Sequence, residues 1–298
     1  MSTATAPDLA SSGDVTTPTV SVVVPAHDEA RTLHRTLAAL RTAAVREVPD
    51  VVVVANGCSD DTAEVARAAG VRVVELGQAS KAAALRAGDE AALTFPRVYL
   101  DADIVLTPGA LDELTDTLRT DEPVVASPRV KFDTAASSWP VRAFYRAYEQ
   151  IPYVREGLVG LGVYGVSRTG RARFGQFPDV RGDDLFVQRL FAPAERRTSG
   201  GRFVVAAPRD LRNLVRVRTR TALGNAELAG AAPVPSSAGA SAGFERSTDS
   251  TVAALVRTAV SRPAMVPAVA VYVGVTVVSR LLACSRRGTA WHRDSSTR

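Results

Sequence analysis

Three short valine-rich runs recur within the first hundred residues, and each is followed by a segment with helical periodicity. The runs are TVSVVVP (19–25), DVVVVAN (50–56) and VRVVEL (71–76), and the helical segments cover 28–45, 60–69 and 80–93. Continuous β-branched runs of this length are typical of strands that are buried on both faces of a sheet. The alternation therefore predicts βαβ units, a largely parallel sheet and flanking helices.

Composition narrows the classes of partner. The chain has 298 residues, 46% of them hydrophobic and 22% charged, which is ordinary for a globular protein with a sizeable core. The formal charge of +5 suits an anionic lipid or a phosphorylated small molecule. No basic run is interleaved with aromatic residues, so we expect no nucleic-acid binding. Cys58 and Cys284 lie too far apart in the sequence to indicate a disulfide framework or a metal site, which favours a reducing compartment.

The ends of the chain differ in composition from its middle. We expect a disordered leader (1–18), a catalytic-type α/β domain (19–228), a flexible Ala/Ser/Gly/Pro linker (229–250), a membrane-associated or transmembrane helical segment (251–285) and a basic polar tail (286–298).

The C-terminal apolar segment carries the membrane prediction. The run AMVPAVAVYVGVTVVS (264–279) holds no charge and lies between Arg262 and Arg280. It is slightly shorter than the ~20 residues of a spanning helix, although arginines can extend such a helix by snorkelling. A buried core helix is the alternative, but the linker separates this run from the main domain. Arginines on both sides leave the orientation open, so spanning, in-plane and hairpin arrangements all remain. We expect attachment to the cytoplasmic face of the cell membrane.

Two carboxylates follow the fourth predicted strand, in VYLDADIVL (98–106). The carboxyl ends of parallel strands share the edge where open α/β sheets bind ligands. On an extended backbone, Asp101 and Asp103 would face the same side. Two close carboxylates repel unless a cation lies beside them, and hard cations such as Mg²⁺ or Mn²⁺ prefer oxygen ligands. The alternative, capping of the turn before Pro108, is less consistent with a strand end.

Other polar residues follow the neighbouring strands. Lys81 begins an otherwise apolar helix, where it is either solvated or able to reach a phosphate. Neither GxGxxG nor GxxxxGK[ST] occurs in these loops, which disfavours dinucleotide-binding and P-loop proteins. Downstream, Arg216, Arg218 and Arg220 alternate, and on an extended segment they would share a face able to clamp a diphosphate. The aromatic, arginine-bearing segment 137–154 suits either a helix in a lipid headgroup layer or an ordinary core-facing helix.

Together these segments resemble the family 2 inverting glycosyltransferases of the GT-A fold. The resemblance runs from about residue 20 to 228 and rests on SVVVPAHDEA, VVVVANGCSDDTAEVA, the lysine of SKAAALRAG, YLDADIVLTPGAL and GDDLFVQRL. It implies a GT-A, nucleotide-diphospho-sugar transferase-like α/β fold, with a Rossmann-like, mostly parallel sheet, flanking helices and, here, an added C-terminal hydrophobic helix. The implied donor is a nucleotide-diphosphate sugar, and the implied cofactor is Mn²⁺ or Mg²⁺.

The resemblance also assigns roles to residues. It implies that Asp101 and Asp103 hold the metal and donor, and that Asp184 of RGDDLFVQRL is the base, supported by Asp183. The donor-binding residues it implies are Pro25, Ala26, Glu29, Asn56, Lys81, Asp101, Arg218 and Arg220. The chain has Asn56 where the family often has an aspartate that contacts the base, so the nucleotide is left open. The Q-x-x-R-W tryptophan of processive relatives is absent, which favours a single transfer.

These residues predict transfer of one sugar to a lipid-linked or cell-envelope acceptor. Two alternatives remain at this point. A sugar-nucleotide nucleotidyltransferase would share the sheet and acidic site but should carry a glycine-rich, basic first loop, which PAHDEA is not. A catalytically inert, membrane-associated nucleotide-sugar binding protein would keep affinity for nucleotide without transfer.

Overall fold

A computed structural model of the chain describes residues 17–155, 161–180, 182–230 and 242–285. Most of the predicted leader, the middle of the predicted linker and the predicted basic tail therefore lie outside the described residues. Helix α10 (Ala242–Ser261) starts within the predicted linker, and α9 (Leu211–Gly230) runs up to its beginning. The linker boundaries at 229 and 250 are thus wrong, since both flanks are helical.

The predicted strand–helix alternation is confirmed at the N-terminal end. The elements are β1 (Val20–Ala26), α1 (Ala30–Ala43), β2 (Pro49–Asn56), α2 (Thr62–Ala68), β3 (Arg72–Leu76), α3 (Lys81–Ala91) and β4 (Arg97–Leu100). The valines of β1 and β4 and those of β2 are buried, as continuous β-branched runs in a covered sheet require, whereas the valines of β3, at the edge of the sheet, are half-buried. Helix α3 begins at an N-cap, Ser80, whose hydroxyl accepts from the N–H of Ala83.

The later elements extend this sheet and add a group of helices. They are β5 (Val105–Leu106), α4 (Ala110–Leu118), β6 (Val125–Asp133), α5 (Trp139–Tyr148), α6 (Pro152–Arg155), β7 (Val163–Val166), α7 (Arg168–Arg171), α8 (Asp183–Arg189), η1 (Pro193–Glu195), β8 (Arg196–Ala206), α9, α10, η2 (Pro263–Met265) and α11 (Val266–Ser285). The aromatic segment 137–154 forms two helices, α5 and α6, rather than one.

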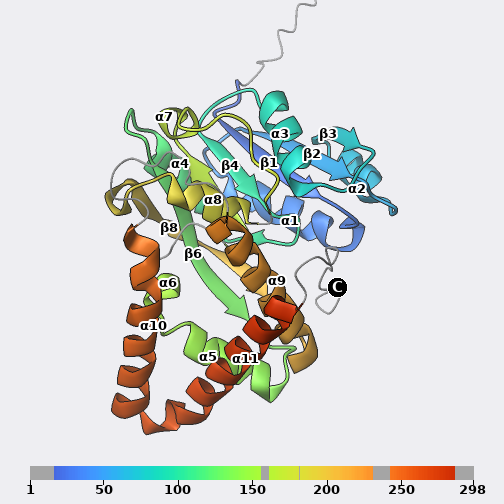
Figure 1. Cartoon of the computed structure of the whole chain (residues 1–298). Coiled ribbons are helices and arrows are strands. Elements are labelled where there is room, and N and C mark those ends of the chain that lie inside the picture. Colours follow the sequence, from blue (N-terminus) through green and yellow to red (C-terminus); the bar gives the residue numbers. More distant parts are fainter. Residues whose placement is uncertain (1–16, 156–160, 181, 231–241, 286–298) are drawn as a thin grey trace, which may run out of the picture.

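One mixed sheet organises the chain, in the order β3-β2-β1-β4-β7-β6-β8-β5. Strands β3, β2, β1 and β4 are parallel, β7 runs antiparallel to β4 and β6, and β6 pairs with β8 in parallel. The sheet is therefore mostly parallel, as predicted. Figure 1 shows α5, α9, α10 and α11 gathered beside the far end of the long strand β6, below the main sheet.

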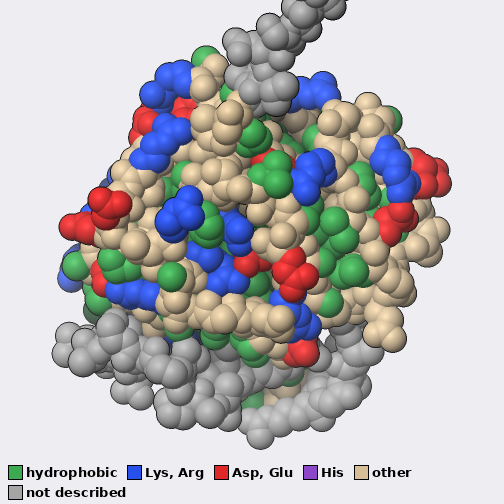
Figure 2. Space-filling view, turned by 90° about the horizontal axis from the view of Figure 1, so that it is seen from above, with side chains coloured by type: hydrophobic (Ala, Val, Ile, Leu, Met, Phe, Trp, Pro, Cys, Tyr) green, Lys and Arg blue, Asp and Glu red, His purple; other side chains and the backbone are tan. Residues whose placement is uncertain are grey.

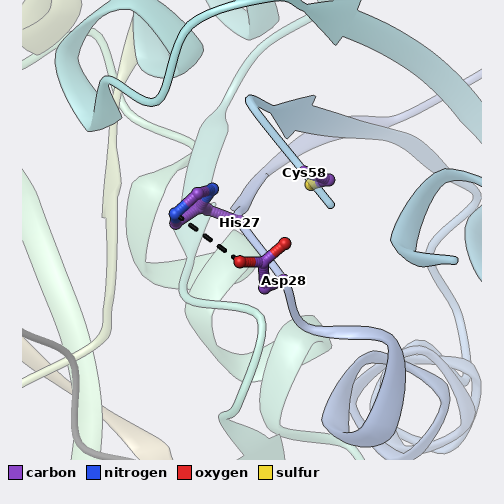
Figure 3. A group of neighbouring side chains, drawn as sticks. All are labelled: His27, Asp28 and Cys58. Atoms are coloured by element: carbon purple, nitrogen blue, oxygen red, sulfur yellow. Dashed lines mark ion pairs between the residues drawn. The ribbon is translucent and has the colours of Figure 1, made fainter. Parts of the chain in front are cut away.

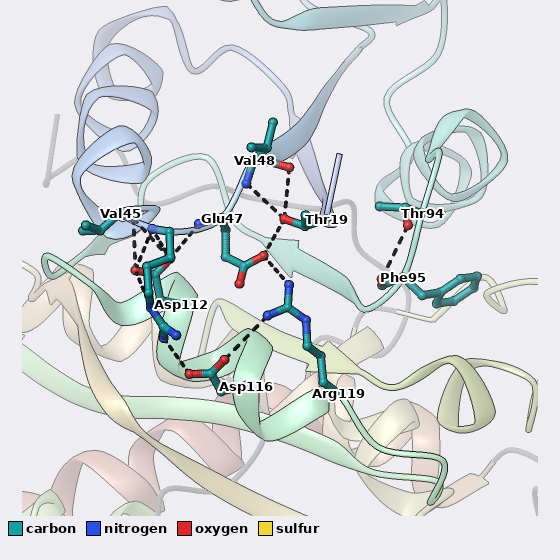
Figure 4. A network of polar contacts seen from close by, with 10 residues as sticks. Thr19, Val45, Glu47, Val48, Thr94, Phe95, Asp112, Asp116 and Arg119 are labelled. Atoms are coloured by element: carbon teal, nitrogen blue, oxygen red, sulfur yellow. Dashed lines mark hydrogen bonds and ion pairs between the residues drawn. The ribbon is translucent and has the colours of Figure 1, made fainter. Parts of the chain in front are cut away.

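A buried acidic side chain fixes α4 against the loop that follows α1. The carboxylate of Asp112, 4% exposed, accepts the backbone N–H groups of Val45, Arg46 and Glu47 at 3.1–3.2 Å (Figure 4). Glu47 in turn accepts from Arg119 at 2.6 Å. These hydrogen bonds satisfy the buried Asp112 carboxylate and tie α4 to the segment that leads into β2.

A second buried carboxylate, Asp89, ties α3 to β4 and α7. It accepts from the hydroxyl of Tyr99 at 2.8 Å and from Nε of Arg171 at 2.9 Å, and it pairs with Arg97. Burial alone would raise the pKa of Asp89, but the hydrogen bonds from Arg171, Tyr99 and Arg97 outweigh it and lower the pKa below its ordinary value. The ionised carboxylate is therefore part of the folded structure.

Replacing Asp89 by Ala is expected to lower the free energy of unfolding by about 3 kcal/mol, because two half-buried guanidinium groups lose their partner. Glu90→Ala, at an exposed position of the same helix, should change it by less than ~0.5 kcal/mol. Urea unfolding followed by circular dichroism checks both. Since the folded pKa is lowered, the contribution is complete above the unfolded pKa of about 4 and is lost as the pH falls toward the folded value. Equal stability of the two variants would contradict this account.

Candidate active site

The predicted acidic motif lies in a turn at the carboxyl end of β4. The N–H of Ile104 donates to the carbonyl of Asp101 at 3.2 Å, so residues 101–104 turn back instead of continuing extended. The expectation that Asp101 and Asp103 face the same side of an extended backbone is therefore wrong, because the backbone turns at these residues. Asp101 is half-buried and Asp103 is exposed. The turn is held to α1 by Thr36, whose hydroxyl donates to the carbonyl of Ala102 at 2.8 Å.

Lysine 81 joins the two acidic motifs that the sequence places eighty residues apart. Its Nζ lies 2.8 Å from Oδ1 of Asp101 and 2.8 Å from Oδ1 of Asp183. Burial opposes the charge of Lys81, but the carboxylates of Asp101 and Asp183 outweigh it and raise the pKa of the ammonium above its ordinary value. Lys81 is therefore a permanent cation between two carboxylates, rather than a solvated surface lysine.

The neighbouring pair Asp183–Asp184 begins α8, and its two members differ in environment. Asp183 is 6% exposed and accepts from the hydroxyl of Tyr164 at 3.1 Å. Burial and the charge of Asp183 raise the pKa of Asp184 to about 6, against the opposing effect of Lys81. A carboxylate with this pKa is ionised at neutral pH and is still basic enough to accept a proton, which suits a general base.

The two residues that precede β7 (Val163–Val166) contribute contacts that the sequence did not predict. The N–H of Leu161 donates to Oδ2 of Asp184 at 3.3 Å, and the carbonyl of Gly162 accepts from the N–H of Asp101 at 2.7 Å. Gly162 has φ +109°, and a Cβ there would lie 2.7 Å from the Ile104 side chain. The segment 157–168, GLVGLGVYGVSR, is rich in glycine, a pattern that suits either close approach to a ligand or tight packing. In its described part, residues 161–168, Gly162 packs against the acidic turn; residues 157–160 lie outside the described residues.

Burial raises the pKa of Tyr164 well above its ordinary value, and the Asp183 carboxylate adds to this shift. Tyr164 is therefore a hydrogen-bond donor to Asp183 and not an acid. Its only sequence signal is a tyrosine in an otherwise apolar strand, which does not distinguish this role from ordinary packing.

The residues predicted for the loop after the first strand divide between that strand and the next helix, and Asn56 ends β2. Pro25 and Ala26 are the last residues of β1, and Glu29 is the buried N-cap residue of α1. Asn56 is 2% exposed; its amide donates to the carbonyl of Ala26 at 2.7 Å and accepts from the N–H of Ser80 at 3.0 Å. Its side chain thus holds two loops together, and the predicted contact with a nucleotide base is not the role its surroundings indicate.

Three polar side chains of mixed type cluster beside these loops. The ligand atoms of His27, Asp28 and Cys58 lie within 4.8 Å of one another, and His27 Nε2 is 3.8 Å from Asp28 Oδ2 (Figure 3). The cluster offers nitrogen and sulfur as well as oxygen. Asp101 and Asp103 offer only carboxylate oxygens, so they fit Mg²⁺ or Mn²⁺ better than this cluster does.

The prediction of an arginine clamp on an extended segment is wrong, because the segment is helical. Arg216, Arg218 and Arg220 lie within helix α9, where alternate residues point to different faces. The guanidinium of Arg218 lies over the rings of Tyr148 and Phe144, with its carbon 5.0 and 5.6 Å from their centroids. Arg218 therefore packs α9 against α5, and Arg220, two residues on, does not share its face. The structure does not bring either of them together with Lys81 as an extended clamp would.

Comparison with known protein families identifies the family of this chain. The sequence model described as "Glycosyl transferase family 2" matches residues 21–174, just over half of the chain. No curated protein matches the chain. The family match places the protein among the glycosyltransferases. The chain belongs to glycosyl transferase family 2.

Solved structures show the same fold at low sequence identity. The mannosyltransferase PcManGT from Pyrobaculum calidifontis, in complex with GDP-Man and Mn²⁺, is 22% identical, with a TM-score of 0.59 over 90% of this chain and 86% of that chain. Glucosyl-3-phosphoglycerate synthase from Mycobacterium tuberculosis, in complex with phosphoglyceric acid, is 20% identical, with a TM-score of 0.50 over 71% of this chain and 78% of that chain. The predicted GT-A fold is thereby confirmed.

Proposed function

We propose that this protein is a metal-dependent inverting glycosyltransferase that moves one sugar from a nucleotide-diphosphate sugar to a lipid-linked or cell-envelope acceptor. The observation that carries the proposal is the position of Lys81, which bonds Asp101 of the acidic turn and Asp183 of the Asp183–Asp184 pair at 2.8 Å each. A donor-binding group and a candidate base thus belong to one site. The family membership supplies the reaction class, and PcManGT was solved with GDP-Man and Mn²⁺.

Each side chain has a role that its surroundings support. Asp184 accepts the proton of the acceptor hydroxyl as that oxygen attacks the anomeric carbon, opposite the departing diphosphate. Asp183 holds Lys81, and Tyr164 holds Asp183. Asp103, exposed, and Asp101, half-buried, would hold Mn²⁺ or Mg²⁺. When bound, such a cation neutralises charge on the leaving diphosphate.

The loop after β1 provides the surface for the nucleotide in this proposal. Pro25 and Ala26 end β1 at the start of this loop, Glu29 ends the loop as the N-cap of α1, and the Asn56 amide donates to the carbonyl of Ala26.

Membrane association is the other part of the proposal, with the cytoplasmic face as the location. Within the described residues, one helical stretch, Pro263–Ser285, is long and apolar enough to cross a membrane, with only 22% of its most apolar window buried. The site would then act on an acceptor held at the membrane, which suits a lipid-linked substrate.

A thermal-shift panel of nucleotide sugars with and without Mn²⁺ tests the donor and metal. We expect one donor to raise the melting temperature only when Mn²⁺ is present, because a ligand that binds the folded state stabilises it by mass action. Asp103→Asn should lose most of the Mn²⁺-dependent shift, whereas Asp121→Asn, an exposed aspartate of another turn, should keep it. A full shift in Asp103→Asn would remove Asp103 from the metal site.

The reaction product separates this proposal from its alternatives. Release of a nucleoside diphosphate with the acceptor glycosylated supports transfer. Pyrophosphate as product would instead indicate a nucleotidyltransferase, which is not the family that the sequence matches. Donor binding with no product under any acceptor would indicate an inert binding protein.

A further inference from the structure

Helix α11 is apolar apart from the exposed Arg280 near its end, and it is buried along one face only. Its buried residues recur at helical spacing: Ala268, Tyr272, Val275, Ser279 and Ala283. The opposite face carries exposed hydrophobic side chains, namely Val266, Val273, Val277, Val278 and Leu281, each 45–66% exposed. A contiguous apolar surface of this kind marks a contact with another molecule or a membrane.

The buried face of α11 lies along α5 and α9, which argues against a spanning orientation. The ring of Tyr272 stacks on Phe144 of α5 at 5.2 Å, and the hydroxyl of Ser279, two turns later, lies 3.4 Å from the carbonyl of Val215 in α9. If α11 crossed a bilayer, α9 would be drawn into the hydrocarbon with Arg216, whose side chain is exposed. Charged side chains there are strongly disfavoured. As packed, α11 suits the plane of the interface.

Helix α10 continues the apolar surface. Its exposed Val252, Val256 and Val260 are four residues apart and therefore share one face. Figure 1 shows α10 and α11 meeting in a corner at the bottom of the molecule, near α5. The face seen from above in Figure 2, by contrast, carries Lys, Arg, Asp and Glu side chains interspersed with small groups of hydrophobic ones. The extended apolar surface thus belongs to the α10–α11 corner.

A groove of about 440 Å³ lies beside this corner, between α5 and the start of α11. We call it the α5–α11 groove; its lining includes Thr134, Trp139, Arg142, Arg146, Ala264 and Pro267. Arg142 and Arg146 are one helical turn apart and both are exposed, and Trp139 is 58% exposed on the same side of α5. Among the described residues, neither arginine forms an ion pair with a carboxylate. Arginine and tryptophan side chains beside an apolar surface are typical of the membrane interface, where the arginines can pair with the negatively charged phosphate headgroups.

We propose that the α5–α11 groove binds the phosphate headgroup of an anionic phospholipid while the exposed faces of α10 and α11 enter the interfacial layer. The protein then lies on the membrane plane, with α11 in the interface rather than across the bilayer. This inference rests on the membrane part of the proposed function and makes no use of the donor site.

Flotation with vesicles tests the headgroup site. The whole chain should float with vesicles of roughly 70% phosphatidylcholine and 30% phosphatidylglycerol and should bind pure phosphatidylcholine vesicles more weakly. The double variant R142E/R146E should bind the anionic vesicles at least about tenfold more weakly, since each basic residue near such a surface contributes roughly a fivefold change in affinity. The control R31E/R35E makes the same charge change on two exposed arginines of α1, also four residues apart, and should bind like the original protein.

Three results would overturn the proposal. If R142E/R146E and R31E/R35E weakened binding to the anionic vesicles equally, the binding would depend on overall charge and not on the α5–α11 groove. Resistance of the vesicle-bound protein to extraction at alkaline pH would indicate a spanning helix. A stable dimer that binds no vesicle, and that Leu281→Asp converts to monomer, would show that a second copy covers α11. Because R142E/R146E should keep the Mn²⁺-dependent donor shift, failure of membrane docking is distinguishable from failure of the transferase assignment.

Discussion

Replacing Asp184 by Asn is expected to lower kcat by about 10³-fold while leaving donor binding unchanged. The substitution keeps the size of the side chain, and the amide oxygen can still accept one of the two backbone N–H groups, of Leu161 and Leu185, that the carboxylate accepts, but an amide cannot accept the proton of the acceptor hydroxyl. Steady-state transfer assays measure the loss. The thermal shift with donor and Mn²⁺ should persist, because Asp184 contacts neither in the proposed arrangement.

The pH profile provides an independent readout of the same residue. Burial and the neighbouring charge of Asp183 raise the pKa of Asp184 to about 6, so kcat/KM should fall as the pH drops below about 6, where the carboxyl becomes protonated. The loss should approach tenfold for each further pH unit. In Asp184→Asn this acid limb should disappear from the residual activity.

A matched control is available close by. Asp179 is 75% exposed and pairs with Arg86, so Asp179→Asn removes a carboxylate five residues away without altering the site. It should keep nearly full activity and the same acid limb. If Asp184→Asn behaved like this control, another residue would have to be the base.

The sheet, and the position of Asp101 at its carboxyl edge, could be predicted from the sequence because both depend on short-range patterns of residues. Valine runs such as residues 50–56 are stable only when buried on both faces, and this dictates a covered parallel sheet. The chain order then fixes that Asp101 lies at the carboxyl edge, next to the loops after β1 and β2. These predictions depend on pattern alone, and they are confirmed.

The errors arise where one pattern is compatible with two structures. Alternating arginines at 216–220 share a face on a strand, but arginine is also a good helix former, and the packing of Arg218 on Tyr148 accompanies a helix. Likewise, Asn56 follows a strand as a ligand-binding residue would, yet its amide is occupied by two backbone groups of other segments. Such assignments depend on what lies opposite in space.

The contact between Lys81 and the two aspartates could not be predicted from the sequence either, because it also depends on which segments meet in space. Sequence alone leaves Lys81 either solvated or near a phosphate, since a lysine at the start of a helix has no fixed partner. Its position between Asp101 and Asp183 results from the pairing of β4 with β7 and from the placement of α8, which are separated widely in the chain. The pKa of Asp184 follows from this assembly and has no counterpart in the local sequence.

Replacing Lys81 by Met should therefore disable the site by a route that differs from loss of the base. The cation that bonds Asp101 and Asp183 disappears, and the two carboxylates repel. We expect kcat/KM to fall by about 10²-fold, as for loss of a single charged group that positions a site. Lys81→Arg, which keeps the charge, should recover part of the activity.

The direction of the pH shift identifies the electrostatic role. Lys81 lowers the pKa of Asp184 toward its ordinary range, so its removal should raise that pKa further and move the acid limb to a pH above 6. Lys131, the other lysine of the chain, is exposed on β6, and Lys131→Met should leave both activity and the limb unchanged. If Lys81→Met lost activity while its acid limb stayed in place, Lys81 would act on the donor and not on the base. A limb that moved to lower pH would contradict the assignment of Asp184, because a carboxylate that loses a neighbouring cation can only become harder to ionise.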